Sequence, residues 1–226
     1  MIKTNHIGKV APGFYELHSH YGFYLDKTPN EVTQELDQQI KSLQNDFNKG
    51  QKWNDYLAGE IEHEYKITPK NITSEYIKWL VEQIERESNY ILATKQIYEP
   101  LNCDDLWVNF QQKLEFNPPH HHNGLYSFVF WHQIPFTIEE EQSRIKYNAS
   151  SERYKHGAFE FIYPAMEANK MVVKNFTVPT DKSMEGWVSI FPSDMGHMVY
   201  PFYTSDDYRI TIAGNVRTQR DWEKIQ

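Results

Sequence analysis

Cysteine is nearly absent from this chain, which contains Cys103 alone among its 226 residues. One cysteine excludes an intramolecular disulfide and a thiolate metal cluster, and this usage is typical of a reducing compartment. No run approaches the roughly 20 apolar residues that cross a membrane. The first residues also lack the apolar stretch of a secretory signal. We therefore expect a cytoplasmic protein with no membrane partner.

Clusters of basic residues are missing as well. The 23 Lys and Arg are outnumbered by 31 Asp and Glu, which gives a formal net charge of -8. Binding to a phosphate backbone relies on lysine and arginine, so a nucleic-acid partner is not expected. The chain has no glycine-rich phosphate loop, dinucleotide fingerprint or Gly-x-Ser-x-Gly motif. Kinase, dehydrogenase and serine-hydrolase readings therefore have no support.

Aromatic residues, in contrast, make up 15% of the chain. This is a folded composition, and the length suits one substantial core. We expect a single domain over residues 1–226, with a helical part over about 1–100.

Two helices are predicted in that first part. Thr28-Pro29-Asn30-Glu31 predicts a capping box with Pro29 at the first helical position. The helix is expected to end near Gly50 in the left-handed conformation. A second helix is expected from Thr73, and His63 is expected on a helix surface. The predicted apolar faces are Val32, Leu36, Ile40, Leu43 and Phe47 in the first helix, and Tyr76, Ile77, Leu80, Val81, Ile84 and Ile91 in the second.

From about residue 101 the pattern changes to short runs rich in aromatic and β-branched residues, separated by turn residues. Such runs predict a β-sandwich or small barrel, with the helices packed against it. The runs are Leu106–Gln112, Leu125–His132, Ala158–Tyr163, Met171–Val178, Trp187–Phe191, Met198–Tyr203 and Tyr208–Asn215.

Three histidines are candidate metal ligands. On a strand, His120 and His122 would point to the same face and His121 away from it, and His197 begins a later strand. Neutral imidazole binds iron(II), which needs ligands on one face and open positions opposite. Read separately, the triple histidine also fits a solvated turn, and a lone His197 is more often structural.

Arg209 and Thr211 are candidate anion ligands. On a strand the two side chains share a face, where a guanidinium and a hydroxyl can hold a carboxylate. A buried arginine needs such an anion. Periodicity does not tell which face of this strand is inward. Asn109 and Ser127, on strands flanking the histidines, either contact the same ligand or cap the sheet. Trp107, Phe128, Phe130 and Trp187 are candidate pocket walls.

Several runs carry a family resemblance. They are LWVNFQ from Leu106, FNPPHHHNGLYSFVF from Phe116, IFPSDMGHMVYPF from Ile190, RITIAGN from Arg209 and, more weakly, LAGEIEHEY from Leu57. As an ordered set these runs resemble the 2-oxoglutarate- and iron(II)-dependent oxygenases that are widespread in bacteriophages, notably those of cyanobacteria. The similarity extends from about residue 55 onward.

The resemblance implies a mainly β fold, a double-stranded β-helix (jelly roll, cupin-like) over about 101–226, with N-terminal helices packed on the sheet. It implies Fe(II) and 2-oxoglutarate as co-substrate, with His197 as the distal metal ligand. Arg209 would pair with the far carboxylate of 2-oxoglutarate, assisted by Thr211. For a phage-encoded protein, the expected location becomes the host cytoplasm.

The chain departs from the wider superfamily at the second ligand, which is usually a carboxylate in a His-x-Asp/Glu motif. Here no Asp or Glu lies between Glu115 and Glu139. Two alternatives follow: a neutral site of His120, His122 and His197, or His122 and His197 with an open position next to Gly124.

Three hypotheses therefore stand. The first is an iron(II)/2-oxoglutarate oxygenase, a hydroxylase acting on an unidentified protein side chain or small molecule. The second is a jelly-roll module that binds a metal or a partner without turnover, for which Arg209 should be exposed. The third is a three-histidine dioxygenase that uses no 2-oxoglutarate and tolerates loss of Arg209.

Overall fold

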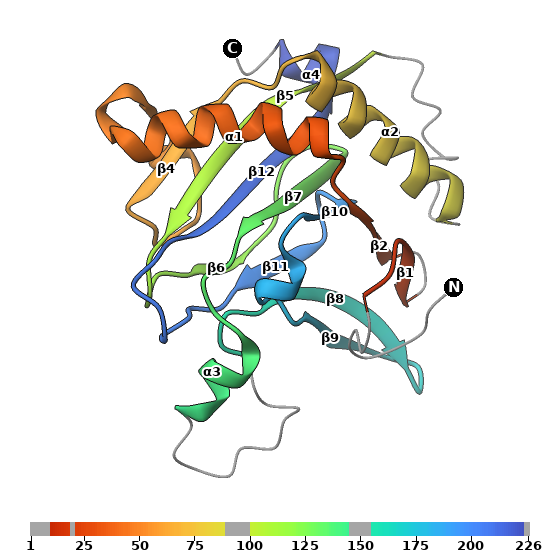
Figure 1. Cartoon of the computed structure of the whole chain (residues 1–226). Coiled ribbons are helices and arrows are strands. Elements are labelled where there is room, and N and C mark those ends of the chain that lie inside the picture. Colours follow the sequence, from red (N-terminus) through yellow and green to blue (C-terminus); the bar gives the residue numbers. More distant parts are fainter. Residues whose placement is uncertain (1–9, 19–20, 89–99, 145–154, 224–226) are drawn as a thin grey trace.

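The computed structural model describes residues 10–18, 21–88, 100–144 and 155–223, which form two antiparallel sheets and flanking helices (Figure 1). The large sheet has eight strands in the order β1-β2-β10-β7-β12-β5-β4-β3. In chain order these are β1 (Gly13–His18), β2 (Tyr21–Lys27), β3 (Gln51–Lys52), β4 (His63–Ile67), β5 (Leu101–Gln111), β7 (Tyr126–Gln133), β10 (Trp187–Pro192) and β12 (Arg209–Thr218).

The small sheet has four strands in the order β6-β11-β8-β9. They are β6 (Asn117–His120), β8 (Phe159–Glu167), β9 (Lys170–Val178) and β11 (Gly196–Val199). The helices are α1 (Asn30–Asn45), α2 (Asn71–Glu87), α3 (Ile138–Ser143) and α4 (Gln219–Trp222), with short 3-10 turns at η1 (Phe47–Lys49), η2 (Asn54–Tyr56) and η5 (Lys182–Met184). This arrangement confirms the predicted jelly roll with helices on its sheet.

Alternation along the central strands separates the core from the cavity. Ile210 and Ile212 of β12, with Val108 and Phe110 of β5, pack in one cluster with the apolar residues of α1 and α2. The residues that alternate with them, including Arg209 and Thr211, therefore face the other way, toward the small sheet. Figure 1 shows both long helices on the side of the large sheet that is turned away from the small sheet. The helices thus settle which face of β12 carries the site.

The first helix is confirmed, but its predicted boundaries are wrong. Pro29 is the N-cap and has no side-chain group that could cap the helix, while the Thr28 backbone N–H donates to the Gly186 carbonyl and its hydroxyl makes no capping bond. Gly50 has φ -88, so it is not left-handed; it follows η1. A side chain at Gly50 would lie 2.4 Å from Tyr65 Cδ1, so this glycine is required for close packing.

Other differences lie in the remaining elements. The second helix starts at Asn71 rather than Thr73, and the predicted Ile91 lies outside the described residues. His63 is on strand β4, not a helix, and its ring stacks 4.2 Å from that of Phe47. The first hundred residues also supply β1 to β4. None of the helices in the described ranges combines the length and apolar character that crossing a bilayer requires.

Candidate active site

The candidate site is an open cavity with walls from both sheets, enclosing about 680 Å³ when the solvent at its mouth is included. Its lining includes every metal and co-substrate residue predicted above: His120, His122, His197, Arg209, Thr211, Asn109 and Ser127. Of the predicted aromatic walls, Trp107 and Phe128 line the cavity, joined by Trp131, Phe159 and Phe191. Phe130 and Trp187 belong to the two apolar cores instead.

The three histidines come together at the small sheet. His120 ends β6 and is the register partner of His197 in β11. His122 follows in the loop, where its backbone N–H donates to the Ser193 carbonyl at 2.8 Å. One ligand atom from each imidazole lies within 4.8 Å of the others, while His121 is exposed. The strand ends at His120, so the loop rather than strand alternation turns His122 into the group.

Backbone contacts select the tautomer of two of these rings. Nδ1 of His120 lies 2.7 Å from the Pro118 carbonyl, and Nδ1 of His197 lies 3.1 Å from the Met195 carbonyl. A carbonyl only accepts, so each Nδ1 carries the proton and each Nε2 keeps its lone pair. Metal-binding histidines are oriented in this way. The donor set therefore fits a divalent transition metal such as iron(II).

Burial keeps the three imidazoles neutral. It lowers the pKa of His120 and of His197, and it lowers the pKa of His122 to about 3, with the neighbouring histidines adding to the effect. Neutral rings are the form that binds a metal. In the described part of the chain no carboxylate joins this group. A bound dication would therefore keep its full charge until an anionic ligand arrives.

Arg209 is a buried cation with uncharged partners. Its side chain is 2% exposed, and its Nε and Nη2 donate to Gln111 Oε1 at 3.0 and 2.6 Å. Nη1 donates to the Gly157 carbonyl and Nη2 to the Tyr200 carbonyl. Burial lowers the pKa of Arg209 to about 9, so the guanidinium stays charged at neutral pH. Its burial is the opposite of what the binding-module hypothesis predicted.

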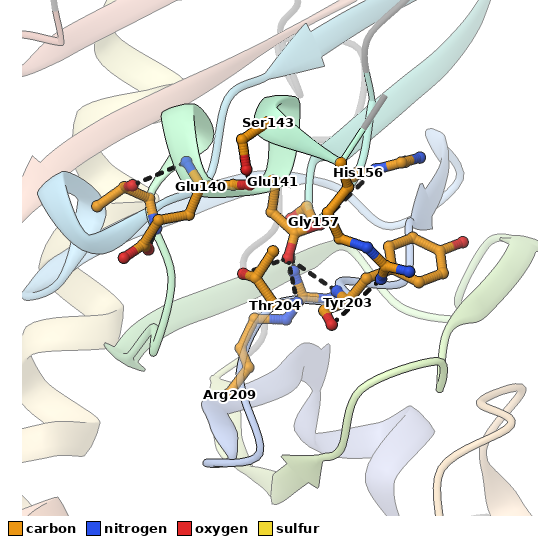
Figure 2. Close-up of polar contacts among 10 residues, drawn as sticks. Glu140, Glu141, Ser143, His156, Gly157, Tyr203, Thr204 and Arg209 are labelled. Atoms are coloured by element: carbon orange, nitrogen blue, oxygen red, sulfur yellow. Dashed lines mark hydrogen bonds and ion pairs between the residues drawn. The ribbon is translucent and has the colours of Figure 1, made fainter. Parts of the chain in front are cut away.

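One acid, Glu141, acts on Arg209 through its charge. Figure 2 shows the Glu141 carboxylate of α3 pointing toward Tyr203 and Thr204, whose backbone N–H groups donate to its Oε1 at 2.8 and 2.7 Å. Glu141 opposes the fall in the pKa of Arg209. These hydrogen bonds hold the segment between β11 and β12 beside Arg209.

Thr211 and Asn109 are register partners on adjacent strands. Asn109 Nδ2 donates to Thr211 Oγ1 at 3.2 Å, while Asn109 Oδ1 is buried without a hydrogen-bond partner. Ser127 Oγ donates to Asn215 Oδ1 at 2.8 Å and lies 2.9 Å from Ser193 Oγ. Ser127 therefore lines the cavity with its proton already engaged.

Several site residues were missed from sequence. Gln111 is two residues from Asn109 and opposite Arg209 in the register, so pairing β5 with β12 would have found it. The carbonyls of Gly157 and Tyr200, which accept from Arg209, lie outside the strands, and no sequence motif marks a backbone acceptor of this kind.

Comparison with known proteins supports this chemistry. Residues 105–215 match the family model described as "Putative 2OG-Fe(II) oxygenase". A comparison with curated proteins finds no match.

Among solved structures, a Pseudomonas putida prolyl-4-hydroxylase is 11% identical with a TM-score of 0.51, covering 88% of this chain and 94% of its own. A Trichoplax adhaerens prolyl hydroxylase, solved with a hypoxia inducible factor peptide fragment, is 12% identical with a TM-score of 0.46, covering 90% and 86%.

The Pseudomonas structure establishes the fold. The family match spans the strands that carry the histidines, Arg209 and Thr211. Together with the three histidines, which could hold a metal ion, that match supports an iron(II)- and 2-oxoglutarate-dependent dioxygenase.

Proposed function

We propose that this dioxygenase is a hydroxylase in which His120, His122 and His197 hold iron. In the same proposal, Arg209 and Thr211 hold the far carboxylate of 2-oxoglutarate. The observation that carries it is the presence, in one cavity, of three neutral imidazoles and a buried guanidinium that has only uncharged hydrogen-bond partners. An anion bound there would supply the missing countercharge.

Iron with 2-oxoglutarate and oxygen supplies the oxidation: the keto acid becomes succinate and carbon dioxide, and one oxygen atom enters a C–H bond of the substrate. The chain's own residues bind and orient. Gln111 accepts from two nitrogens of Arg209 and sets the plane of the guanidinium. Trp107 packs at 5.6 Å on His122, and Phe159 at 5.5 Å on His197, so aromatic rings exclude water beside the ligands.

The proposed substrate is a protein side chain or a small molecule, the two classes expected from the sequence. The similar Pseudomonas structure is a prolyl-4-hydroxylase; a protein side chain is therefore the first class to screen. The net charge of -8 disfavours nucleic acid. The phage type and a cytoplasmic location remain proposals that rest on the sequence resemblance and composition.

A second candidate, a three-histidine dioxygenase without 2-oxoglutarate, is favoured by one observation. Within the described ranges no acid joins the histidines, whereas iron sites that use a co-substrate usually have two histidines and one carboxylate. The two candidates differ in whether Arg209 matters.

Anaerobic titration of the apo protein with iron(II) and then 2-oxoglutarate tests the proposal, followed by the visible charge-transfer band of the chelated metal. The band should appear with the unmodified chain, vanish in His197→Ala, and weaken in Arg209→Ala. His121→Ala is the matched control, because His121 is exposed beside two of the proposed ligands. Bound iron with no band would refute the 2-oxoglutarate proposal and favour the second candidate. No bound iron would make the histidines structural.

A further inference from the structure

Glu64 continues the row of residues that contains the co-substrate contacts. It is the register partner of Asn109, which in turn is the register partner of Thr211, so one residue from each of β4, β5 and β12 stands side by side. Partners across an antiparallel ladder share a face of the sheet. Asn109 and Thr211 line the cavity, so Glu64 is turned to the same side. It is 0% exposed.

Two buried oxygen atoms in this row have no hydrogen-bond partner: Glu64 Oε1 and Asn109 Oδ1. The other carboxyl oxygen of Glu64, Oε2, accepts from Asn54 Nδ2 at 3.4 Å. An ionised carboxylate and an amide oxygen both only accept, so they cannot satisfy each other. A proton on Glu64 turns it into a donor and removes both unsatisfied acceptors at once.

Building on the function proposed above, we propose that Glu64 is a positioning residue for 2-oxoglutarate. As a neutral carboxylic acid it donates to Asn109 Oδ1, which directs the hydroxyl proton of Thr211 toward the bound carboxylate. With Oδ1 engaged, the Asn109 amide presents Nδ2 to Thr211 Oγ1, the contact seen at 3.2 Å. Thr211 accepts there and keeps its own proton for the anion.

Ionisation of Glu64 would reverse the direction of each hydrogen bond in this series. The Asn109 amide turns to donate Nδ2 to the carboxylate, because β4 and β12 lie on opposite sides of β5. Oδ1 then faces Thr211, whose proton goes to Asn109. The hydroxyl would present only lone pairs to 2-oxoglutarate, and the hydrogen bond to the anion would be lost.

The surroundings of Glu64 keep it neutral near pH 7. Burial raises its pKa to about 8, and the negative charge of Glu115 acts in the same direction. Its neighbours on β5 and η2, Asn109 and Asn54, are uncharged amides, and the cation of β12, Arg209, is held by Gln111.

The segment between η2 and β4 closes over Glu64. Its acids, Glu60 and Glu62, are tied through their backbone N–H groups to the Phe116 carbonyl and to Glu115 Oε1. A side chain at Gly59 would lie 2.9 Å from Glu64 Oε1, so this segment excludes water from the acid. The sequence resemblance included this segment without assigning it a role, and shielding Glu64 supplies one.

The test is the affinity of the anaerobic iron-loaded protein for 2-oxoglutarate between pH 6.5 and 9. In the unmodified chain the Kd should rise about tenfold as pH passes through 8, the effect of one lost hydrogen bond. Glu64→Gln should show no step at pH 8, because its amide donates at any pH; it should share only the weakening toward pH 9 that the titration of Arg209 imposes on every variant. Thr211→Val should bind about tenfold more weakly at every pH, with no step near 8.

A second readout needs neither metal nor turnover: carbon-13 NMR titration of the Glu64 carboxyl in the apo protein, assigned by its loss in Glu64→Gln. Titration near pH 8 supports the proposal, and titration below pH 5 overturns it. A step near pH 8 that persists in Glu64→Gln overturns it too. Failure to bind 2-oxoglutarate at any pH overturns the proposed function as well, whereas tight binding that is independent of pH overturns the role of Glu64 alone.

Discussion

Replacing Arg209 by methionine should remove the response of the protein to 2-oxoglutarate while leaving its iron site intact. Four of the five N–H groups of the guanidinium are engaged, by Gln111, Gly157 and Tyr200. One N–H is left for the co-substrate, as a charge-assisted hydrogen bond worth about 1.5–3 kcal/mol. Because methionine removes the charge as well as this hydrogen bond, we expect a loss of about 2–3 kcal/mol, or roughly 30- to 150-fold in Kd.

Unfolding of the anaerobic iron-loaded protein, with and without 2-oxoglutarate, measures this loss. At a ligand concentration of 100 times the original Kd, binding stabilises the unmodified protein by about 2.7 kcal/mol. A variant that binds 100-fold more weakly gains only about 0.4 kcal/mol under the same conditions. Arg209→Lys, which keeps the charge but not the planar fork, should fall between the two.

The matched control is Arg144→Met, since Arg144 is exposed and its Nη1 donates to the Tyr203 carbonyl near the same wall. It should respond to 2-oxoglutarate as the unmodified chain does. Equal stabilisation of Arg209→Met and the unmodified protein would refute the reasoning, because the buried charge would then have no part in co-substrate binding.

Three further predictions concern the metal, the packing and the buried acid. His197→Ala should abolish stoichiometric iron(II) binding in equilibrium dialysis, whereas His121→Ala should bind as before; equal loss in both would mean that the fold, not the ligand set, had been damaged. Gly50→Ala should lower the free energy of unfolding by about 1–3 kcal/mol through overpacking against Tyr65, measured by denaturant titration, with iron affinity unchanged as the control.

The third follows from the pKa of Glu64, raised from 4.5 to about 8. Above pH 4.5 the unfolded chain loses this proton while the folded protein keeps it, so stability falls as pH rises, by about 1.4 kcal/mol per unit up to pH 8. Glu64→Gln should remove that part of the slope, and an unchanged slope would show that Glu64 is not the group responsible.

The candidate site was predictable where chemistry and spacing coincide. His120 and His122 precede one strand and His197 begins another, and the conjunction of these histidines with Arg209 and Thr211, rather than any one residue, suggested a single site. Which face of β12 turns toward the cavity was not predictable, because the alternation of Arg209 and Ile210 fits a strand with either face inward. Packing of Ile210 beneath the helices decides it, and that is a tertiary contact.

Glu64 could not be found from the sequence. It lies in a run of charged residues around His63 that reads as a solvent-exposed helix, yet the run forms β4 between β3 and β5. A carboxyl that is neutral because it is buried looks, in a sequence, like any surface acid. Gln111 could not be identified from the sequence either, because its contact with Arg209 depends on the register between β5 and β12.

The small sheet leaves β6 at one edge, a strand of four residues that ends at His120. An edge strand presents unpaired backbone groups to other chains, and the short length and two prolines of β6 limit such pairing. A metal shared by His120 and His197 would clasp this edge strand to its neighbour β11, across the ladder that already pairs them. Bound iron would then stabilise the pairing of β6 with β11 in addition to its role in the reaction. Without the metal, the edge strand would be held to β11 by the backbone ladder alone.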